Sequence, residues 1–207
     1  PESRIEIIND GVDVHYFSPN NRMPTPPSEL RVGIVGRIEP FKRIIECLKI
    51  ASDLKTSGTA FSFSFVGGHY DSKYFQEVLA TRSRLGLEAV CHFLPEKADM
   101  REFYQSIDVL LTLSGGSVML EAMAMAIPVV AAAPPCPPEH TIVKHGQTGF
   151  LYDFNDLKGV AESLRMLAAS PSLLSELGAK GRKKAEQTFD FDALFARTLD
   201  TYQNITR

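Results

Sequence analysis

The sequence has few cysteines and no uninterrupted apolar run long enough to cross a membrane. Its three cysteines are Cys47, Cys91 and Cys136. They lie far apart and form no CxxC pair, which argues against a disulfide framework and against a zinc site. The longest apolar stretch, residues 118–133, is interrupted by Glu121 and Pro128. With no signal-peptide pattern, these absences predict a cytoplasmic protein in which Cys47 and Cys91 are buried free thiols.

The sequence also lacks an excess of positive charge. It has 22 Lys and Arg residues against 25 Asp and Glu residues, for a formal net charge of −3. Nucleic acids are bound through clustered cations that neutralise many phosphates, so no nucleic-acid partner is expected. Any phosphate recognition should be local, through a few cations and backbone amides. No basic amphipathic helix is present either, so membrane contact is expected only if another domain supplies it.

What is present is an alternation of short apolar runs with segments of helical periodicity. Strands are expected at residues 31–36, 61–66, 89–94, 109–113 and 129–133, and helices at residues 41–54, 74–85, 100–106, 118–126, 157–168, 172–187 and 191–202. Such alternation predicts parallel βαβ units with right-handed crossovers. The fold class is therefore α/β, a doubly wound Rossmann-like parallel sheet. Ligands of such sheets bind at the carboxyl ends of the strands, where the chemistry should lie.

The turn after the first expected strand carries three cations. Arg37 ends that strand, and Lys42 and Arg43 follow Pro40, a residue suited to the first turn of a helix. Cations in a first helical turn oppose the helix dipole, and an anion bound between them would remove the conflict. The alternative is that the cations are solvated and that Glu39 offsets their charge.

The turn after the fourth expected strand, residues 114–117, reads Ser-Gly-Gly-Ser and opens a helix at Val118. Glycines let a ligand approach the backbone closely, and the free amides of a helix N-terminus attract phosphate. The alternative is an ordinary glycine turn with a serine N-cap.

The helix that follows is apolar on every face except at Glu121. A helix that is apolar all round is buried, and a buried carboxylate needs hydrogen-bonding or charged partners. Glu121 is thus a candidate to accept hydrogen bonds from ligand hydroxyl groups. The alternative is a carboxylate that reaches solvent through a narrow exposed strip.

Together these turns resemble the glycosyltransferase group 1 family, a large family of retaining enzymes with the GT-B fold. The matching segments are Val35-Gly36-Arg37 with Lys42, Phe65-Val66-Gly67-Gly68, Tyr104 with Asp108, Leu120-Glu121-Ala122-Met123-Ala124, and Gly149-Phe150-Leu151. Each segment alone is a weak signal, but their order and spacing are specific. The resemblance covers nearly the whole chain and implies the C-terminal half of a GT-B fold.

The resemblance also implies a site for a nucleoside-diphosphate sugar, the donor substrate. Arg37 and Lys42 would bind the diphosphate and neutralise the leaving group, so that no metal and no cofactor is expected. Glu121 would bind the ribose hydroxyls, and backbone near Phe93 and Leu94 would face the base. The other positions implied to line the donor site are Gly36, Gly67, Ser114, Gly115, Gly116, Ser117 and Val118. The sugar would pass, with retention, to a glycan, a lipid or a small molecule.

The resemblance implies three segments with different roles. Residues 1–28 are expected to lead in from a missing N-terminal domain, residues 29–190 to form the nucleotide-sugar-binding domain, and residues 191–207 to form a helix that packs on the missing domain. We therefore expect a full-length parent enzyme, an inactive isolated fragment, and an exposed apolar patch where the missing domain docks.

Two positions depart from the family pattern. The family has two glutamates separated by seven residues; Glu121 matches the second, and Leu113 occupies the place of the first. That first glutamate usually touches the donor sugar. The glycine that commonly follows the phosphate-binding lysine is Arg43 here. Leu113 keeps open a degenerate, non-catalytic module that binds a nucleotide or a protein, and a nucleotide-sugar epimerase of GT-B fold is a further alternative.

Overall fold

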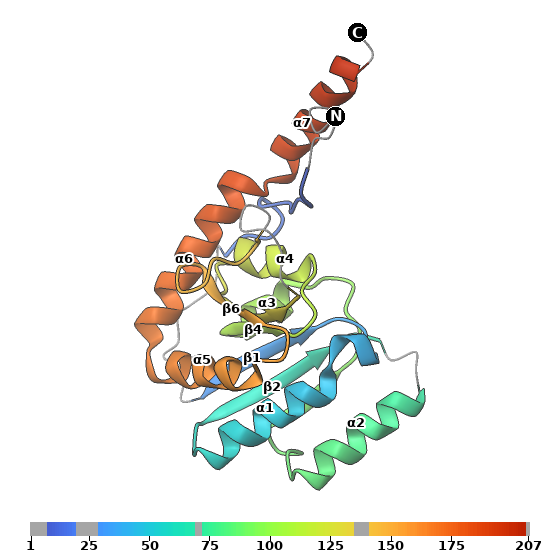
Figure 1. Cartoon of the computed structure of the whole chain (residues 1–207), viewed down its shortest axis with the longest axis vertical. Coiled ribbons are helices and arrows are strands. Elements are labelled where there is room, and N and C mark those ends of the chain that lie inside the picture. The colour runs from blue at the N-terminus through green and yellow to red at the C-terminus, as the bar shows by residue number, and fades with distance from the viewer. Residues whose placement is uncertain (1–7, 20–28, 69–71, 135–140, 206–207) are drawn as a thin grey trace.

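The computed structural model describes residues 8–19, 29–68, 72–134 and 141–205. Within these residues, six parallel strands form one sheet in the order β3-β2-β1-β4-β5-β6 (Figure 1). The strands are β1 (Leu30–Val35), β2 (Phe61–Val66), β3 (Cys91–Leu94), β4 (Val109–Thr112), β5 (Val129–Ala133) and β6 (Gly149–Asp153). This order reverses direction between β1 and β4, and ligands of open α/β sheets bind in the crevice at such a switch point.

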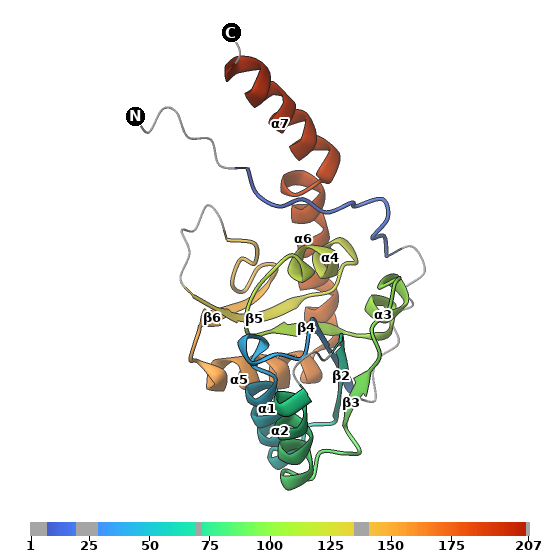
Figure 2. The ribbon, with the colours of Figure 1, turned by 90° about the vertical axis from the view of Figure 1, so that its right-hand side faces the viewer.

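Helices cover both faces of the sheet (Figures 1 and 2). They are η2 (Pro40–Lys42, a 3-10 helix), α1 (Ile44–Thr56), α2 (Ser72–Arg84), α3 (Arg101–Ser106), α4 (Val118–Ala124), α5 (Leu157–Ala169), α6 (Pro171–Thr188) and α7 (Phe191–Ile205). Helices α1, α2 and α5 pack on one face and α3 and α4 on the other, while α6 packs against both α4 and α5. Neighbouring residues of β4 therefore enter different cores, Leu111 with the first group and Leu110 with the second.

The sequence predicted this doubly wound α/β fold and five of the six strands. It did not predict β6, which pairs in parallel with β5 from Val129↔Gly149 to Ala133↔Asp153. This strand lies at the edge of the sheet, and its exposure increases toward Asp153. It therefore lacks the continuous apolar run that marks a buried parallel strand.

The prediction that Lys42 and Arg43 lie in the first turn of an α-helix is wrong. Pro40 begins η2, which ends at Lys42, and α1 begins only at Ile44. Between them Arg43 adopts a left-handed conformation with φ 56°, and its guanidinium stacks 3.9 Å from the ring centroid of Phe154. The helix dipole of α1 therefore does not oppose these charges in the way the sequence suggested.

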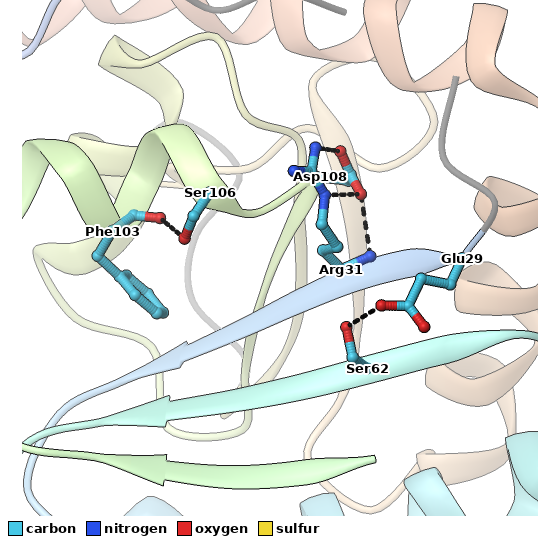
Figure 3. Close-up of polar contacts among 6 residues, drawn as sticks. All are labelled: Glu29, Arg31, Ser62, Phe103, Ser106 and Asp108. Carbon is cyan, nitrogen blue, oxygen red and sulfur yellow. Dashed lines mark hydrogen bonds and ion pairs between the residues drawn. The ribbon is translucent and has the colours of Figure 1, made fainter. Parts of the chain in front are cut away.

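An ion pair joins the two central strands at their amino-terminal ends, opposite the carboxyl ends where the site is expected (Figure 3). Arg31, in β1, donates from Nη2 to Oδ1 of Asp108 at 2.7 Å and from Nε to Oδ2 at 3.0 Å. Asp108 directly precedes β4, so this two-point contact joins the strands that flank the switch point. Nearby, Ser62 donates a hydrogen bond to Glu29.

The buried residues confirm one prediction about the cysteines. Cys47 and Cys91 are both buried free thiols, and burial raises the pKa of the Cys91 thiol to about 12. Cys136 lies outside the described residues. In the described part of the chain no helix is long and apolar enough to span a bilayer.

Candidate functional site

The carboxyl ends of β1 and β2 meet at two glycines. The strands pair in register up to Val35 and Val66, so Gly36 and Gly67 follow side by side. A Cβ at Gly67 would lie 2.2 Å from the carbonyl oxygen of Gly36, a distance that no side chain tolerates. Both glycines also have positive φ, 134° for Gly36 and 151° for Gly67. The close crossing of these two turns therefore requires glycine.

Lys42 lies across this crossing and reaches the second predicted turn. A Cβ at Gly36 would be 3.0 Å from Cε of Lys42, and a Cβ at Gly116 would be 4.0 Å from its Nζ. The ammonium group is thus next to the backbone of the loop that follows β4. The structure brings the two turns singled out in the sequence together, on either side of the switch point.

Two cations of this cluster share an aromatic ring. The Arg37 guanidinium is 5.6 Å and the Lys42 ammonium 5.1 Å from the ring centroid of Phe41. Burial, followed by the nearby charge of Arg37, lowers the pKa of Lys42. Arg37 pairs with Glu39 at 3.3 Å while its own side chain is 57% exposed. The alternative of solvated cations offset by Glu39 thus describes Arg37. Glu39 also acts on Lys42, but burial and Arg37 outweigh it and lower the pKa of Lys42, which therefore favours a further anion beside it.

The loop after β4 presents unused backbone donors. Gly115 and Gly116 have φ of 68° and 110°, and Ser117 occupies the N-cap position of α4 without a side-chain capping bond. The amides of residues 115–118 donate no hydrogen bond to any described residue. In a serine-capped turn the Ser117 hydroxyl would accept from an amide one residue or more into α4, and it accepts none, so that alternative does not describe this loop.

Ser114 adds an unsatisfied hydroxyl to the same loop. Its Oγ is buried and has no hydrogen-bond partner among the described residues. Its backbone N–H donates weakly to Oγ1 of Thr112, at 3.4 Å. Buried hydroxyls normally have a partner, so this loop is suited to a polar ligand.

Glu121 lies in the first turn of α4 and has a protein partner that the sequence did not reveal. The hydroxyl of Tyr104, on α3, donates to Oε2 of Glu121 at 2.7 Å. Burial raises the pKa of Glu121, and this hydrogen bond opposes the rise. The carboxylate is half-buried, so it is neither a core group nor a fully solvated one. The sequence placed Tyr104 within a family motif but did not identify it as a site residue.

Phe93 and Leu94 end β3, two strands away from β1. The ring of Phe93 stacks on Phe65 at 4.8 Å and meets the edge of Phe75 at 5.6 Å. Both residues of β3 are partly buried against the two cores. Their side chains therefore serve packing, and the role implied for the backbone near them stays a prediction.

The first glutamate position of the family pattern lies in the core. Leu113 is 1% exposed and packs with the residues beneath α1 and α5. Its side chain does not join the cluster around Lys42. This position therefore supplies no carboxylate to the candidate site.

The described residues contain no group of three or more His, Cys, Asp or Glu side chains placed to hold a metal ion. Among the described residues, Arg37 and Lys42 place their positive charges together beside the ring of Phe41 in the turn that follows β1. The expectation that no metal takes part stays a prediction.

Solved structures share the fold over most or all of this chain. A glycosyltransferase from Rickettsia africae superposes with a TM-score of 0.87 at 19% identity, covering 100% of this chain and 59% of its own. The Anabaena protein HepE in complex with UDP gives 0.83 at 21% identity, covering 96% and 57%. The C-terminal domain of a group 1 family protein (LpcC) from Francisella tularensis gives 0.75 at 24% identity, and there the match covers 87% of this chain and 100% of that domain.

Sequence relatives point to the same family. D-inositol 3-phosphate glycosyltransferase of Rhodococcus erythropolis is 29% identical over 217 residues, which are 97% of this chain and 48% of the relative. The enzyme of that name from Mycolicibacterium smegmatis is 29% identical over 219 residues, covering 97% and 49%. The chain thus spans about half the length of these relatives. The model of the family described as glycosyl transferases group 1 matches residues 20–184. The chain therefore belongs to the glycosyltransferase group 1 family, and its Rossmann-like α/β sheet is of the kind found in GT-B glycosyltransferases.

Proposed function

We propose that this chain is the donor-binding half of a retaining glycosyltransferase and that it holds a nucleoside-diphosphate sugar at the carboxyl ends of β1 and β4. The observation that carries the proposal is the position of Lys42, which lies over Gly36 and beside Gly116 at the switch point of the sheet. This placement joins a partly desolvated cation to a loop of unused amides. Such a combination suits a diphosphate better than any neutral ligand.

In this proposal the protein cations take over the role of a metal. As the bond between the sugar and the diphosphate breaks, negative charge grows on the leaving oxygen. Arg37 and Lys42 stabilise that charge, and the amides of residues 115–118 hold the distal phosphate. Glu121 accepts hydrogen bonds from the ribose. The anomeric carbon of the sugar leaves the diphosphate oxygen and bonds to an acceptor hydroxyl oxygen, and the hydroxyl proton passes to the departing diphosphate. The buried unpaired thiols of Cys47 and Cys91 support a reducing, cytoplasmic location.

The experiment that tests the proposal is a calorimetric titration of the chain with UDP, GDP and ADP. UDP is the first nucleotide to try because the structural relative HepE was crystallised with it. We expect saturable binding of one of the three diphosphates. If the chain binds none of them at millimolar concentration and the full-length protein binds none either, the proposed donor site is wrong.

The missing partner of the donor-binding half is proposed to be an N-terminal domain that contacts α7. This helix extends away from the sheet (Figures 1 and 2) and exposes four large apolar side chains at helical spacing. They are Phe191, Phe195, Leu199 and Tyr202, with 54%, 55%, 46% and 67% of their surfaces exposed. An exposed apolar face was expected from the sequence. A row of this kind on one helix is typical of an interaction surface.

Serine at both Phe195 and Leu199 is expected to weaken docking of the N-terminal half about tenfold or more. Complete burial of such a side chain is worth about 1.5–3 kcal/mol, and docking would bury the half of each that is now exposed. The stability of the chain itself should hardly change, since both side chains are about half exposed. Association of the separately purified halves, measured by sedimentation, checks this. Met166→Ser removes a side chain of similar exposure from α5 and serves as the control. Equal affinities of the double variant and the control would exclude α7 as the docking surface.

Leu113 favours a second candidate, a nucleotide-binding module without transferase activity. A leucine has no carboxylate to offer at the position where the family pattern places one against the donor sugar, and Leu113 is buried in the core. Hydrolysis of a donor sugar by the full-length protein, lost when Arg37 or Lys42 is replaced, would support the enzyme. Diphosphate binding without any donor hydrolysis or transfer would support the module.

A further inference from the structure

Tyr104 is a fully buried tyrosine whose side-chain hydroxyl reaches the candidate site. It lies on α3 with 0% of its surface exposed. Its hydroxyl donates to Oε2 of Glu121 at 2.7 Å. A buried tyrosine hydroxyl needs a partner, and a half-buried carboxylate needs a donor, so each group satisfies the other.

This contact leaves half of the carboxylate for a ligand. An ionised carboxylate offers two oxygens that together accept about four hydrogen bonds. Tyr104 engages Oε2, and Oε1 of Glu121 has no partner among the described residues. The hydroxyl of Tyr104 thus restricts the rotation of the carboxylate and keeps one oxygen available.

The ring of Tyr104 also packs against an aromatic ring from the segment before β1. Phe17 meets it edge-on, with centroids 6.0 Å apart and planes at 83°. Arg182, on α6, donates from Nη1 to the carbonyl oxygens of Phe17 and Ala124, each at 2.6 Å. The Arg182 guanidinium therefore ties the segment before β1 to the end of α4, the helix that carries Glu121. The tyrosine has little room to change conformation.

We propose that Tyr104 is a positioning residue that orients Glu121 for the vicinal hydroxyls of the nucleotide ribose and thereby gives the site its preference for ribonucleotide over deoxyribonucleotide donors. This inference rests on the proposed function, because it needs a nucleotide at this site. Tyr104 is expected to affect only the recognition of the ribose. The diphosphate is bound elsewhere, by Arg37, Lys42 and the loop amides.

The test compares ribose and deoxyribose ligands in the full-length protein. Whichever of UDP, GDP and ADP binds is titrated together with its 2′-deoxy and 3′-deoxy forms. In the unchanged protein a hydroxyl bonded to a carboxylate should favour the ribonucleotide about tenfold over at least one deoxy form. Tyr104→Phe should reduce that preference by about threefold or more, with little change in the affinity for the deoxy form.

A matched control and a second background separate positioning from simple destabilisation. Tyr152→Phe also removes a hydroxyl, one that bonds Ser163 between β6 and α5, and should leave the preference unchanged. In a Glu121→Gln background the buried charge is gone, so Tyr104→Phe is tolerated there even if it disturbs folding alone. In that background it should have no further effect on the preference, because Tyr104 acts through the carboxylate.

The outcomes distinguish this inference from the proposed function. If Glu121→Gln loses the ribose preference while Tyr104→Phe keeps it, the positioning role is wrong and the donor site stands. If Tyr104→Phe weakens the binding of ribose and deoxyribose ligands equally, Tyr104 contributes only to packing and does not position Glu121. If the unchanged protein binds no diphosphate, the proposed function and the role of Tyr104 are both overturned.

Discussion

Alanine at both Arg37 and Lys42 is expected to weaken binding of a nucleoside diphosphate about a hundredfold or more. Hydrogen bonds to charged groups contribute about 1.5–3 kcal/mol each, and every 1.4 kcal/mol is about a factor of ten in affinity. Lys42 should contribute more than Arg37, because its ammonium is partly desolvated whereas the Arg37 side chain is 57% exposed and paired with Glu39. Calorimetric titration with the preferred diphosphate, on each single variant and on the double variant, measures both contributions.

The control must remove the same amount and kind of charge elsewhere. Arg165 pairs with Asp53, and Lys180 pairs with Glu176, both away from the loops that follow β1 and β4. Alanine at Arg165 and Lys180 therefore matches the change in net charge and the residue types. If this pair weakens binding as much as the Arg37 and Lys42 pair does, long-range attraction explains the affinity and the site lies elsewhere.

The fold could be predicted because the buried strands carry continuous apolar runs bounded by glycine or polar residues. Strands β2 and β5 occur at the predicted residues, and helix α6 begins one residue earlier and ends one residue later than predicted. The local pattern fails where a tertiary contact decides the conformation. Arg43 has a left-handed backbone conformation beside its stacking partner Phe154, which is 111 positions away in the sequence. The sequence pattern near Arg43 does not predict that contact.

The site could be predicted as two turns, but not as an assembled cluster. Sequence order identified the loops around Gly36 and Gly116, and the fold class implied that both lie at carboxyl ends of strands. That Lys42 reaches from one loop to the other depends on η2, which directs its side chain across Gly36. The partner of Glu121 was missed for a similar reason. Tyr104 and Glu121 are 17 residues apart on different helices, and only their packing brings the hydroxyl to the carboxylate.

Alanine at Gly67 is expected to destabilise the chain by about 3 kcal/mol, which for a chain of this size lowers the melting temperature by about 6–12 °C. The added Cβ would lie 2.2 Å from the carbonyl oxygen and 2.6 Å from the carbonyl carbon of Gly36. These are backbone atoms and cannot move aside as a flexible side chain can. The amide of Gly36 is moreover bonded to the carbonyl oxygen of Val66 at 2.9 Å, which holds the two turns together. Thermal unfolding followed by circular dichroism checks the expected shift.

Gly58→Ala separates the steric clash from the cost of positive φ. Gly58 has φ of 73°, but a Cβ there would meet no atom within 4 Å. This variant should therefore cost only about 1 kcal/mol, from backbone strain alone. The two variants should also differ in ligand binding, because displacement of Gly36 displaces Lys42, whose Cε lies 3.0 Å from the position of a Cβ at Gly36. If Gly67→Ala has the same melting temperature and the same affinity for diphosphate as Gly58→Ala, the ends of β1 and β2 can separate freely. The close glycine crossing would then not be what fixes Lys42 at the switch point.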